Sequence, residues 1–155
     1  MTNPPRFAVD TMLGRLARWL RLLGYDTAYG THLSGRTLLR TARAETRIVL
    51  TRRRDLLRRL ELPHLYVDSD HFREQLSQVV LAFDLDVEHL LLTRCPECNR
   101  ELSAETAGTI AHRVPPYVAQ TQERFRSCPR CHRVFWAGTH HEHIRAELRA
   151  LRLER

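Results

Sequence analysis

Apolar residues in the first 90 positions alternate between short runs typical of buried strands and the spacing of three and four typical of helices. Strands are predicted at 7–9, 25–29, 48–51 and 65–67. Helices are predicted at about 13–23, 36–45, 53–60 and 71–83. Alternation of strands and helices predicts an α/β fold in which helices flank a parallel sheet.

Small residues mark the ends of several predicted helices. Gly24 fits the left-handed residue that ends the first helix. Ser34 can cap the second helix, and Pro63 ends the third. Three arginines fall off the apolar stripe of the first helix: Arg15, Arg18 and Arg21. We therefore expect these arginines on the side of the helix away from the core.

Polar residues follow several predicted strands. Asp10, Thr51 and Asp68 each lie at a strand end. Right-handed crossovers place the carboxyl ends of parallel strands at one edge of the sheet, and such sheets bind ligands there. We therefore expect these three residues to line one crevice.

Four cysteines in the second half have the spacing of a metal site. Each pair reads Cys-Pro-x-Cys, and 29 residues separate the pairs. Two residues between cysteines allow a tight turn to aim both sulfurs at one ion, and two turns complete a tetrahedron of thiolates. The alternative is four unrelated buried thiols. We predict one structural Zn²⁺ bound by Cys95, Cys98, Cys128 and Cys131.

Histidines near the second cysteine pair could compete as ligands, or could cap a helix or face solvent. They are His132, His140, His141 and His143. Residues 134–136 predict a strand that returns from the second pair, and the prolines near 115 indicate a surface excursion between the pairs.

The tail at 140–155 predicts a helix with Ile144, Leu148 and Leu151 on one side, packed on either part of the chain. We expect two parts: an α/β domain at 1–90, and a zinc-ribbon module with a C-terminal helix at 91–155.

The chain of 155 residues has a net charge of +7, and all 25 of its basic residues are arginine. Biased codon usage explains this, and so does a phosphate-binding surface, since arginine places two parallel hydrogen bonds on phosphate. No run of 18 apolar residues occurs, so no membrane span is expected. The absence of a secretory signal and the paired cysteines indicate the cytoplasm, where thiols stay reduced.

Five segments together carry a resemblance to a known family. They are 7–10, 12–27, 47–52, 94–99 and 128–140. They resemble the Mut-seven C-terminal RNase family over nearly the whole chain. The resemblance implies a PIN-like ribonuclease fold with a fused zinc ribbon, an RNA-directed role, and a nuclease site for Mg²⁺ or Mn²⁺, ions that take oxygen ligands.

The carboxylates that the family implies are incomplete in this chain. Asp10 matches the family's first acid. No carboxylate occurs between Asp26 and Glu45, where the family usually has an acid opening the second helix. Arg53 stands where the family has an aspartate, and exchanging a negative for a positive charge about 5 Å from a divalent ion turns attraction into repulsion. We therefore expect a degenerate acidic site.

Other roles stay open for the acids around this site. Asp68 or Asp70 could supply a ligand from the fourth strand, whereas Asp55 lies too far around its helix to replace the missing acid. Asp10 is either a metal ligand or a helix cap.

Arginines beside the expected crevice are candidates for RNA binding, with a solvated face as the alternative. They are Arg15, Arg18, Arg52, Arg53 and Arg54. Three functions compete: a divalent-metal endoribonuclease with Asp10 as a ligand, a non-catalytic RNA-binding protein on a nuclease scaffold, and a protein-binding adaptor that uses the zinc ribbon. We favour an RNA-directed protein with impaired or absent cleavage.

Overall fold

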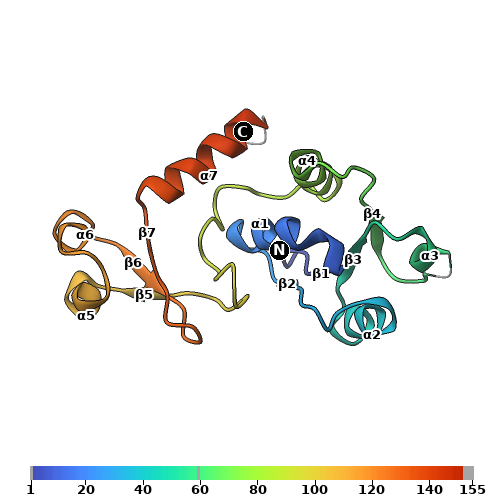
Figure 1. The fold of residues 1–155 in the computed structure, drawn as a ribbon, viewed down its shortest axis with the longest axis horizontal. Coiled ribbons are helices and arrows are strands. Elements are labelled where there is room, and N and C mark those ends of the chain that lie inside the picture. The colour runs from blue at the N-terminus through green and yellow to red at the C-terminus, as the bar shows by residue number, and fades with distance from the viewer. Residues whose placement is uncertain (1, 59, 152–155) are drawn as a thin grey trace.

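The computed structural model describes residues 2–58 and 60–151, and Figure 1 shows a parallel sheet with its helices at one end and an antiparallel sheet at the other. The first part contains β1 (Phe7–Val9), η1 (Thr11–Leu13), α1 (Gly14–Leu22), β2 (Thr27–Ala28), α2 (Gly35–Glu45), β3 (Ile48–Thr51), α3 (Arg54–Leu57), β4 (His64–Tyr66) and α4 (Phe72–Ala82). The second part contains β5 (Ser103–Glu105), α5 (Ala107–Ile110), η2 (Ala111–Arg113), α6 (Pro116–Thr121), β6 (Phe125–Ser127), β7 (Val134–Trp136) and α7 (Thr139–Ala150).

The first sheet has the order β2-β1-β3-β4, and every pair in it is parallel. Phe7 pairs with both Thr27 and Ile48, which fixes β1 at the centre of the register. The predicted parallel sheet flanked by helices is therefore confirmed. Among the described residues, no helix is both long and apolar enough to cross a membrane.

Alternation along the strands divides the core between the two faces of this sheet. Phe7 and Val9 pack with α1 and α4, in a cluster that also holds Leu50. Ala8 and Val49 pack on the other face, against α2 and Leu56 of α3. Two helices therefore cover each face of the sheet.

The strand order places a topological switch between β1 and β3. The chain leaves β1 through α1 to reach β2 on one side, then crosses back through α2 to β3 on the other side. The crossovers diverge at this point, so the carboxyl ends of β1 and β3 lie at the position where α/β sheets bind ligands.

The ends of some helices and strands agree with the sequence prediction, and others differ. Gly24 has the left-handed φ of +94° and follows α1 as expected. Ser34 is the residue before α2, but its side chain makes no capping hydrogen bond. Strand β2 is shorter than the predicted 25–29, because Tyr25 turns into the core and its hydroxyl donates to the Asp86 carbonyl at 2.9 Å. Helix α3 is also shorter than predicted, and residue 59 of that prediction lies outside the described residues.

The second sheet is antiparallel, with the order β5-β6-β7. Helices α5 and α6 pack on one of its faces through Ile110 and Val118, which surround Phe125 of β6. The predicted surface excursion between the cysteine pairs was therefore wrong, since this segment has a core of its own. Pro116 takes the first position of α6, where its missing N–H costs nothing.

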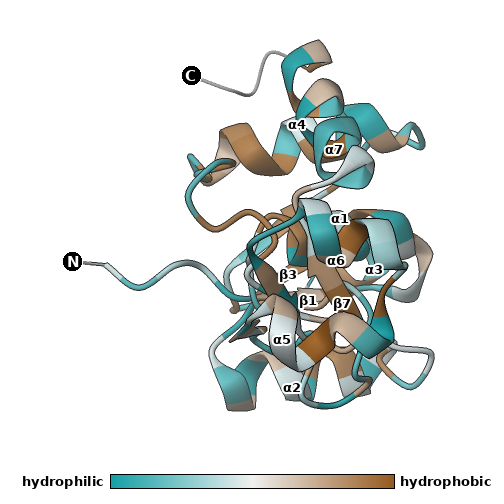
Figure 2. Cartoon of the chain, turned by 90° about the vertical axis from the view of Figure 1, so that its left-hand side faces the viewer, coloured by the Kyte–Doolittle hydropathy of each residue, from teal (hydrophilic) through white to brown (hydrophobic). Residues whose placement is uncertain are grey.

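Helix α7 returns to the first part of the chain. Ile144 and Leu148 are fully buried in the cluster that contains α1 and α4. Arg73 of α4 donates two hydrogen bonds to Glu147, at 3.0 and 2.8 Å. Figure 2 shows α7 beside α4. Of the two packing partners that the sequence left open, the helix packs on the first part; residues 152–155 lie outside the described residues.

Candidate metal centre and nucleic-acid site

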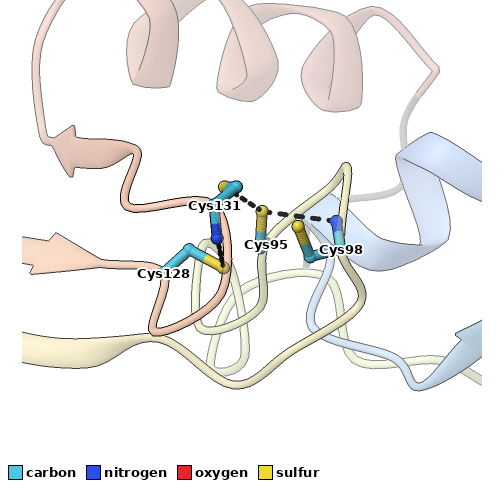
Figure 3. Close-up of side chains that lie close together, drawn as sticks. All are labelled: Cys95, Cys98, Cys128 and Cys131. Carbon is cyan, nitrogen blue, oxygen red and sulfur yellow. Dashed lines mark hydrogen bonds between the residues drawn. The ribbon is translucent and has the colours of Figure 1, made fainter.

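The four cysteines meet in one cluster, as predicted. Their sulfurs all lie within 4.8 Å of one another, and the Sγ atoms of Cys95 and Cys131 are 3.8 Å apart. Four thiolates around one zinc ion at about 2.3 Å would place neighbouring sulfurs about 3.8 Å apart. Figure 3 shows the side chains gathered from two loops. The cluster could therefore hold a metal ion such as zinc.

The two cysteine loops have the same backbone design. The N–H of the first cysteine donates to the carbonyl five residues later, at 2.8 Å from Cys95 and 2.9 Å from Cys128, and its carbonyl accepts the N–H four residues later at 2.9 Å in both loops. That fourth residue is left-handed in each, with φ of 61° at Asn99 and 63° at His132. His132 is exposed, and within the described residues no histidine joins the cluster.

The thiols of the cluster differ in acidity. Burial raises the pKa of Cys95 to about 11, and burial together with neighbouring thiols raises the pKa of Cys98 to about 12. Burial acts in the same direction on Cys131, but hydrogen bonds from the Arg133 backbone and from the other cysteines outweigh it and lower its pKa to about 7. Metal binding therefore has to displace protons from this cluster at neutral pH.

Arg21 joins the first cysteine loop to the parallel sheet. Its Nη1 donates to the carbonyls of Pro96 and Glu97 at 3.2 and 3.1 Å, and its Nε donates to the Thr27 carbonyl at 2.9 Å. The side chain is only 8% exposed. Arg21 lies off the apolar stripe of α1, as expected, but it is buried because the first cysteine loop covers that side of the helix.

Asn99 makes a second joint between the same two regions. Its Oδ1 accepts the Thr27 N–H at 3.0 Å, and its Nδ2 donates to Asp26 at 2.7 Å. Arg47 donates to the same Asp26 oxygen at 2.8 Å. Burial opposes ionisation of Asp26, but these two hydrogen bonds and the charge of Arg47 outweigh it and lower its pKa to about 2. The sequence analysis did not predict this contact. The only local signal for it is the asparagine itself, a residue type that tolerates left-handed backbone.

Asp10 lies buried at the carboxyl edge of the sheet, with 1% of its surface exposed. Thr51 donates its hydroxyl to Asp10 Oδ2 at 2.8 Å, and the Arg53 N–H donates to the Thr51 oxygen at 3.0 Å. The predicted meeting of Asp10 and Thr51 is confirmed. Asp10 precedes η1, yet its side chain makes no capping hydrogen bond there.

Of the other candidate acids, Asp55 and Asp70 lie beside basic side chains, and Asp68 contacts Arg52 through its backbone. Arg53 holds Asp55 with two hydrogen bonds, at 3.4 and 2.7 Å. Asp70 lies beside His71 at 3.6 Å, while the carbonyl of Asp68 accepts a hydrogen bond from Arg52 at 3.5 Å. Across the described residues, the cysteines form the only group of three or more potential metal-binding side chains. The residues around Asp10 do not fit a Mg²⁺ or Mn²⁺ site built from several carboxylates.

Four of the five candidate arginines lie at this carboxyl edge. Arg15, the second residue of α1, stacks its guanidinium over Phe72, the first residue of α4, at 4.3 Å. Arg54 stacks over Tyr66 at 5.0 Å, and Arg52 and Arg53 directly follow β3. Arg18 instead forms an ion pair with Glu97 in the first cysteine loop. The candidate arginines at the carboxyl edge are therefore Arg15, Arg52, Arg53 and Arg54.

The whole chain was compared with known proteins. No curated protein and no solved structure matches it significantly. Residues 5–148 match the family described as the Mut7-C RNAse domain, and this stretch holds β1 with Asp10, the parallel sheet and both cysteine loops. The chain therefore belongs to the Mut7-C RNAse domain family.

Proposed function

We propose that this protein binds RNA along the carboxyl edge of its parallel sheet, and that its ability to cleave RNA with Mg²⁺ or Mn²⁺ is impaired or absent. Membership of an RNase family supports the RNA-directed role. The observation that carries the second part is the surroundings of Asp10, a buried acid whose expected partner position holds Arg53.

Phosphate recognition has a structural basis at this edge. Arg15, Arg52 and Arg54 present guanidinium groups near the ends of β1, β3 and β4. Guanidinium groups bind phosphate oxygens with paired, charge-assisted hydrogen bonds. Helices α1 and α4 begin at the same edge, and the positive ends of their dipoles favour anions. The edge therefore suits an RNA backbone.

Metal-dependent cleavage has a weaker basis. A hard divalent ion needs several oxygen ligands, and a nuclease site gathers carboxylates to provide them. Asp10 already accepts hydrogen bonds from the hydroxyls of Thr51 and, at 3.3 Å, Thr11. The positive charge of Arg53 interacts with Asp10 and would repel a divalent ion there. We propose a PIN-like nuclease scaffold whose acidic site is degenerate.

We further propose that the cysteine cluster holds one structural Zn²⁺. Four protein thiolates close the coordination sphere and leave no open position for a substrate or a reactive water. All four thiols are free in the structure, which fits a reducing compartment such as the cytoplasm. This site would stabilise the fold, while the carboxyl edge binds RNA.

Cleavage of total RNA with and without Mn²⁺ tests the degenerate site. The wild type should cut weakly or not at all, whereas Arg53→Asp should gain cutting that a further Asp10→Asn change abolishes. Arg40→Asp, which makes the same charge change at an exposed position on α2, is the matched control and should gain nothing. Equal cutting by the wild type and Arg53→Asp would contradict the degenerate site, and loss of wild-type cutting in Asp10→Asn would establish an active endoribonuclease.

RNA binding is tested without divalent ions. Affinity should fall steeply as salt rises, because arginine–phosphate contacts release counterions. Replacing Arg52 and Arg54 by alanine should weaken binding and make the salt dependence shallower. Binding that ignores both salt and these arginines would favour a protein-binding adaptor instead.

A further inference from the structure

A cavity of about 400 Å³ lies between the antiparallel sheet, the linker before the first cysteine loop, and α7. Three residues that pair across the sheet form one wall: Ala104 of β5, Arg126 of β6 and Phe135 of β7. Leu91 and Leu92 of the linker and His141 of α7 lie around it. Its volume falls within the about 300–1,000 Å³ of typical small-ligand sites.

Phe135 stands apart from the other aromatic residues of this sheet. Its neighbour Trp136 and the residue paired with Trp136, Phe125, pack on the face that α5 and α6 cover. Side chains alternate along a strand, so Phe135 lies on the opposite face. In the part of the chain that the structure describes, this half-buried ring belongs to none of the three hydrophobic clusters. A flat apolar ring is therefore available to a ligand in the cavity.

Two exposed arginines lie beside this ring. Arg126 donates through Nη1 to the Leu92 carbonyl at 2.9 Å, which fixes its side chain against the linker. Within residues 2–58 and 60–151, neither Arg124 nor Arg126 forms an ion pair with a carboxylate. Of the two carboxylates on the wall, Glu105 accepts hydrogen bonds from neighbouring hydroxyls and Glu123 is exposed. The charge of Arg124 and the remaining N–H groups of Arg126 can therefore bind an anion at the cavity.

His141 adds a polar group to the apolar walls. Burial lowers its pKa, and the charge of Arg145 acts in the same direction. The ring is therefore neutral at physiological pH and offers one hydrogen-bond donor and one acceptor. Phe125 and Trp136 also line the cavity, but both pack in the cluster on the other face of the sheet, so Phe135 is the aromatic ring outside that cluster. This ring and the imidazole of His141 match the face and the edge of a heteroaromatic base.

We propose that this cavity binds one unstacked base of single-stranded RNA, with the base against Phe135 and its flanking phosphates on Arg124 and Arg126. Proteins recognise single strands in this way, by stacking splayed bases on aromatic side chains and holding the backbone with arginines. A duplex keeps its bases paired inside and cannot fill the cavity. This inference rests on the RNA binding proposed above and adds a second contact, on the cysteine-bearing half, that selects single strands.

Binding of a fluorescent six-nucleotide RNA to the zinc-loaded full chain tests the cavity. Phe135→Ala should weaken binding about tenfold, as expected when one stacked base is lost. Tyr117→Ala is the matched control, because Tyr117 is a 69% exposed aromatic on α6 that does not line the cavity; it should leave binding unchanged. An abasic strand of the same length should bind the wild type as weakly as intact RNA binds Phe135→Ala, and a duplex should not distinguish the two proteins.

A second measurement does not depend on the folding of the variant. RNA carrying one 4-thiouridine, photocrosslinked to the wild type, should label peptides that contain residues 91–92, 135–137 or 141. Crosslinks confined to the carboxyl edge would overturn the cavity assignment. So would an unchanged affinity of Phe135→Ala when its zinc content and melting temperature match those of the wild type.

The outcomes also separate this inference from the proposed function. Sensitivity of binding to Arg52 and Arg54 with no effect of Phe135→Ala would remove the cavity and leave RNA binding at the edge. The absence of any RNA binding would remove both. Binding of free AMP or UMP as tight as that of the six-nucleotide RNA, and sensitive to Phe135→Ala, would assign the cavity to free nucleotides and overturn its role in RNA recognition.

Discussion

The cysteine cluster and the carboxyl edge of the parallel sheet are the two places where this chain gathers chemically active side chains, and they are built differently. In the cluster, two loops repeat one set of backbone hydrogen bonds, so each loop aims its own pair of sulfurs. At the edge, residues that follow β1 and β3 must meet across the fold, as Asp10 and Thr51 do through one hydrogen bond. Local backbone design brings the four thiols of the first site together, whereas the second site depends on contacts between distant segments.

The two sites therefore tolerate change differently. Removing one thiolate from four would leave a bound metal ion with an open position and weaken the link between the two cysteine loops. At the edge, Arg53 is accommodated at the surface, where it forms an ion pair with Asp55. We therefore expect the fold to tolerate substitutions at the carboxyl edge better than substitutions in the cysteine cluster.

We expect the largest effect on stability from removing the proposed zinc ion from the cysteine cluster. Cys128→Ser, or chelation of the wild type, should unfold the antiparallel sheet, because binding of a structural zinc supplies about 10 kcal/mol or more of apparent free energy. Zinc content by mass spectrometry and thermal unfolding by circular dichroism measure the effect. His132→Asn is the control: it removes an imidazole beside the cluster, keeps a residue that tolerates left-handed backbone, and should retain zinc and stability. Purified protein without stoichiometric zinc, and with a melting curve that chelation leaves unchanged, would contradict the proposed structural site.

Arg21 tests whether the cluster is a separate module or part of the scaffold. Arg21→Met should lower the free energy of unfolding by about 3 kcal/mol, because buried carbonyls of Thr27, Pro96 and Glu97 would lose a charged donor. Arg18→Met is matched in type and lies one turn earlier on α1, where its ion pair with Glu97 is exposed; it should cost less than about 1 kcal/mol. Urea unfolding measures both. Equal effects would mean that the cysteine loop is not held to the sheet through Arg21.

Some features of the fold and of the two sites could be predicted from the sequence, and others could not. The apolar run at Ile48–Thr51 and the Cys-Pro-x-Cys pairs are local patterns with one physical solution, so a buried strand and a four-sulfur cluster followed from them. The segment between the cysteine pairs was misread, because its prolines suggested a loop. Pro116 is in fact a helix-starting residue, and Thr106 forms a capping box with Thr109.

The sequence could not predict which part of the protein packs against each face of a helix or strand. Ile144 and Leu148 define an apolar side of α7, but their spacing is the same whether that side packs on one sheet or the other. Arg21 lies off the apolar stripe of α1, and only the fold shows that a cysteine loop buries it. Phe135 reads as a core residue of a strand, although its ring lines a cavity. Partners distant in sequence decide these three cases.

The pH dependence of stability tests the contact between Asp26 and Asn99, which connects the parallel sheet to the first cysteine loop. Asp26 has a pKa of about 2, below its ordinary 3.8, so its contribution is complete above about pH 4 and disappears as the pH falls through 2. Asp26→Asn should therefore lower the free energy of unfolding by about 2 kcal/mol at pH 6 and by much less at pH 2. Urea unfolding at the two pH values measures the difference. The exposed Asp70→Asn change is the control and should shift stability by less than about 0.5 kcal/mol. A cost for Asp26→Asn that does not depend on pH would show that its charge does not hold the joint.

The smallest effect is expected from substitution of Thr51, which tests whether Asp10 only stabilises the fold or can also bind a metal ion. Thr51→Val removes the hydroxyl that donates to Asp10 and that accepts the Arg53 N–H, so it should cost about 1 kcal/mol in urea unfolding, while Thr51→Ser should cost less. The same change frees an oxygen of Asp10 for a cation. Metal binding at Asp10 could be prevented by the positive charge of Arg53 or by the hydrogen bond from Thr51. If the charge of Arg53 prevents it, Mn²⁺ should raise the melting temperature of Arg53→Asp but not that of Thr51→Val. Stabilisation of Thr51→Val by Mn²⁺ would instead mean that Asp10 and the Thr51 hydroxyl, not Arg53, decide whether the edge can bind metal.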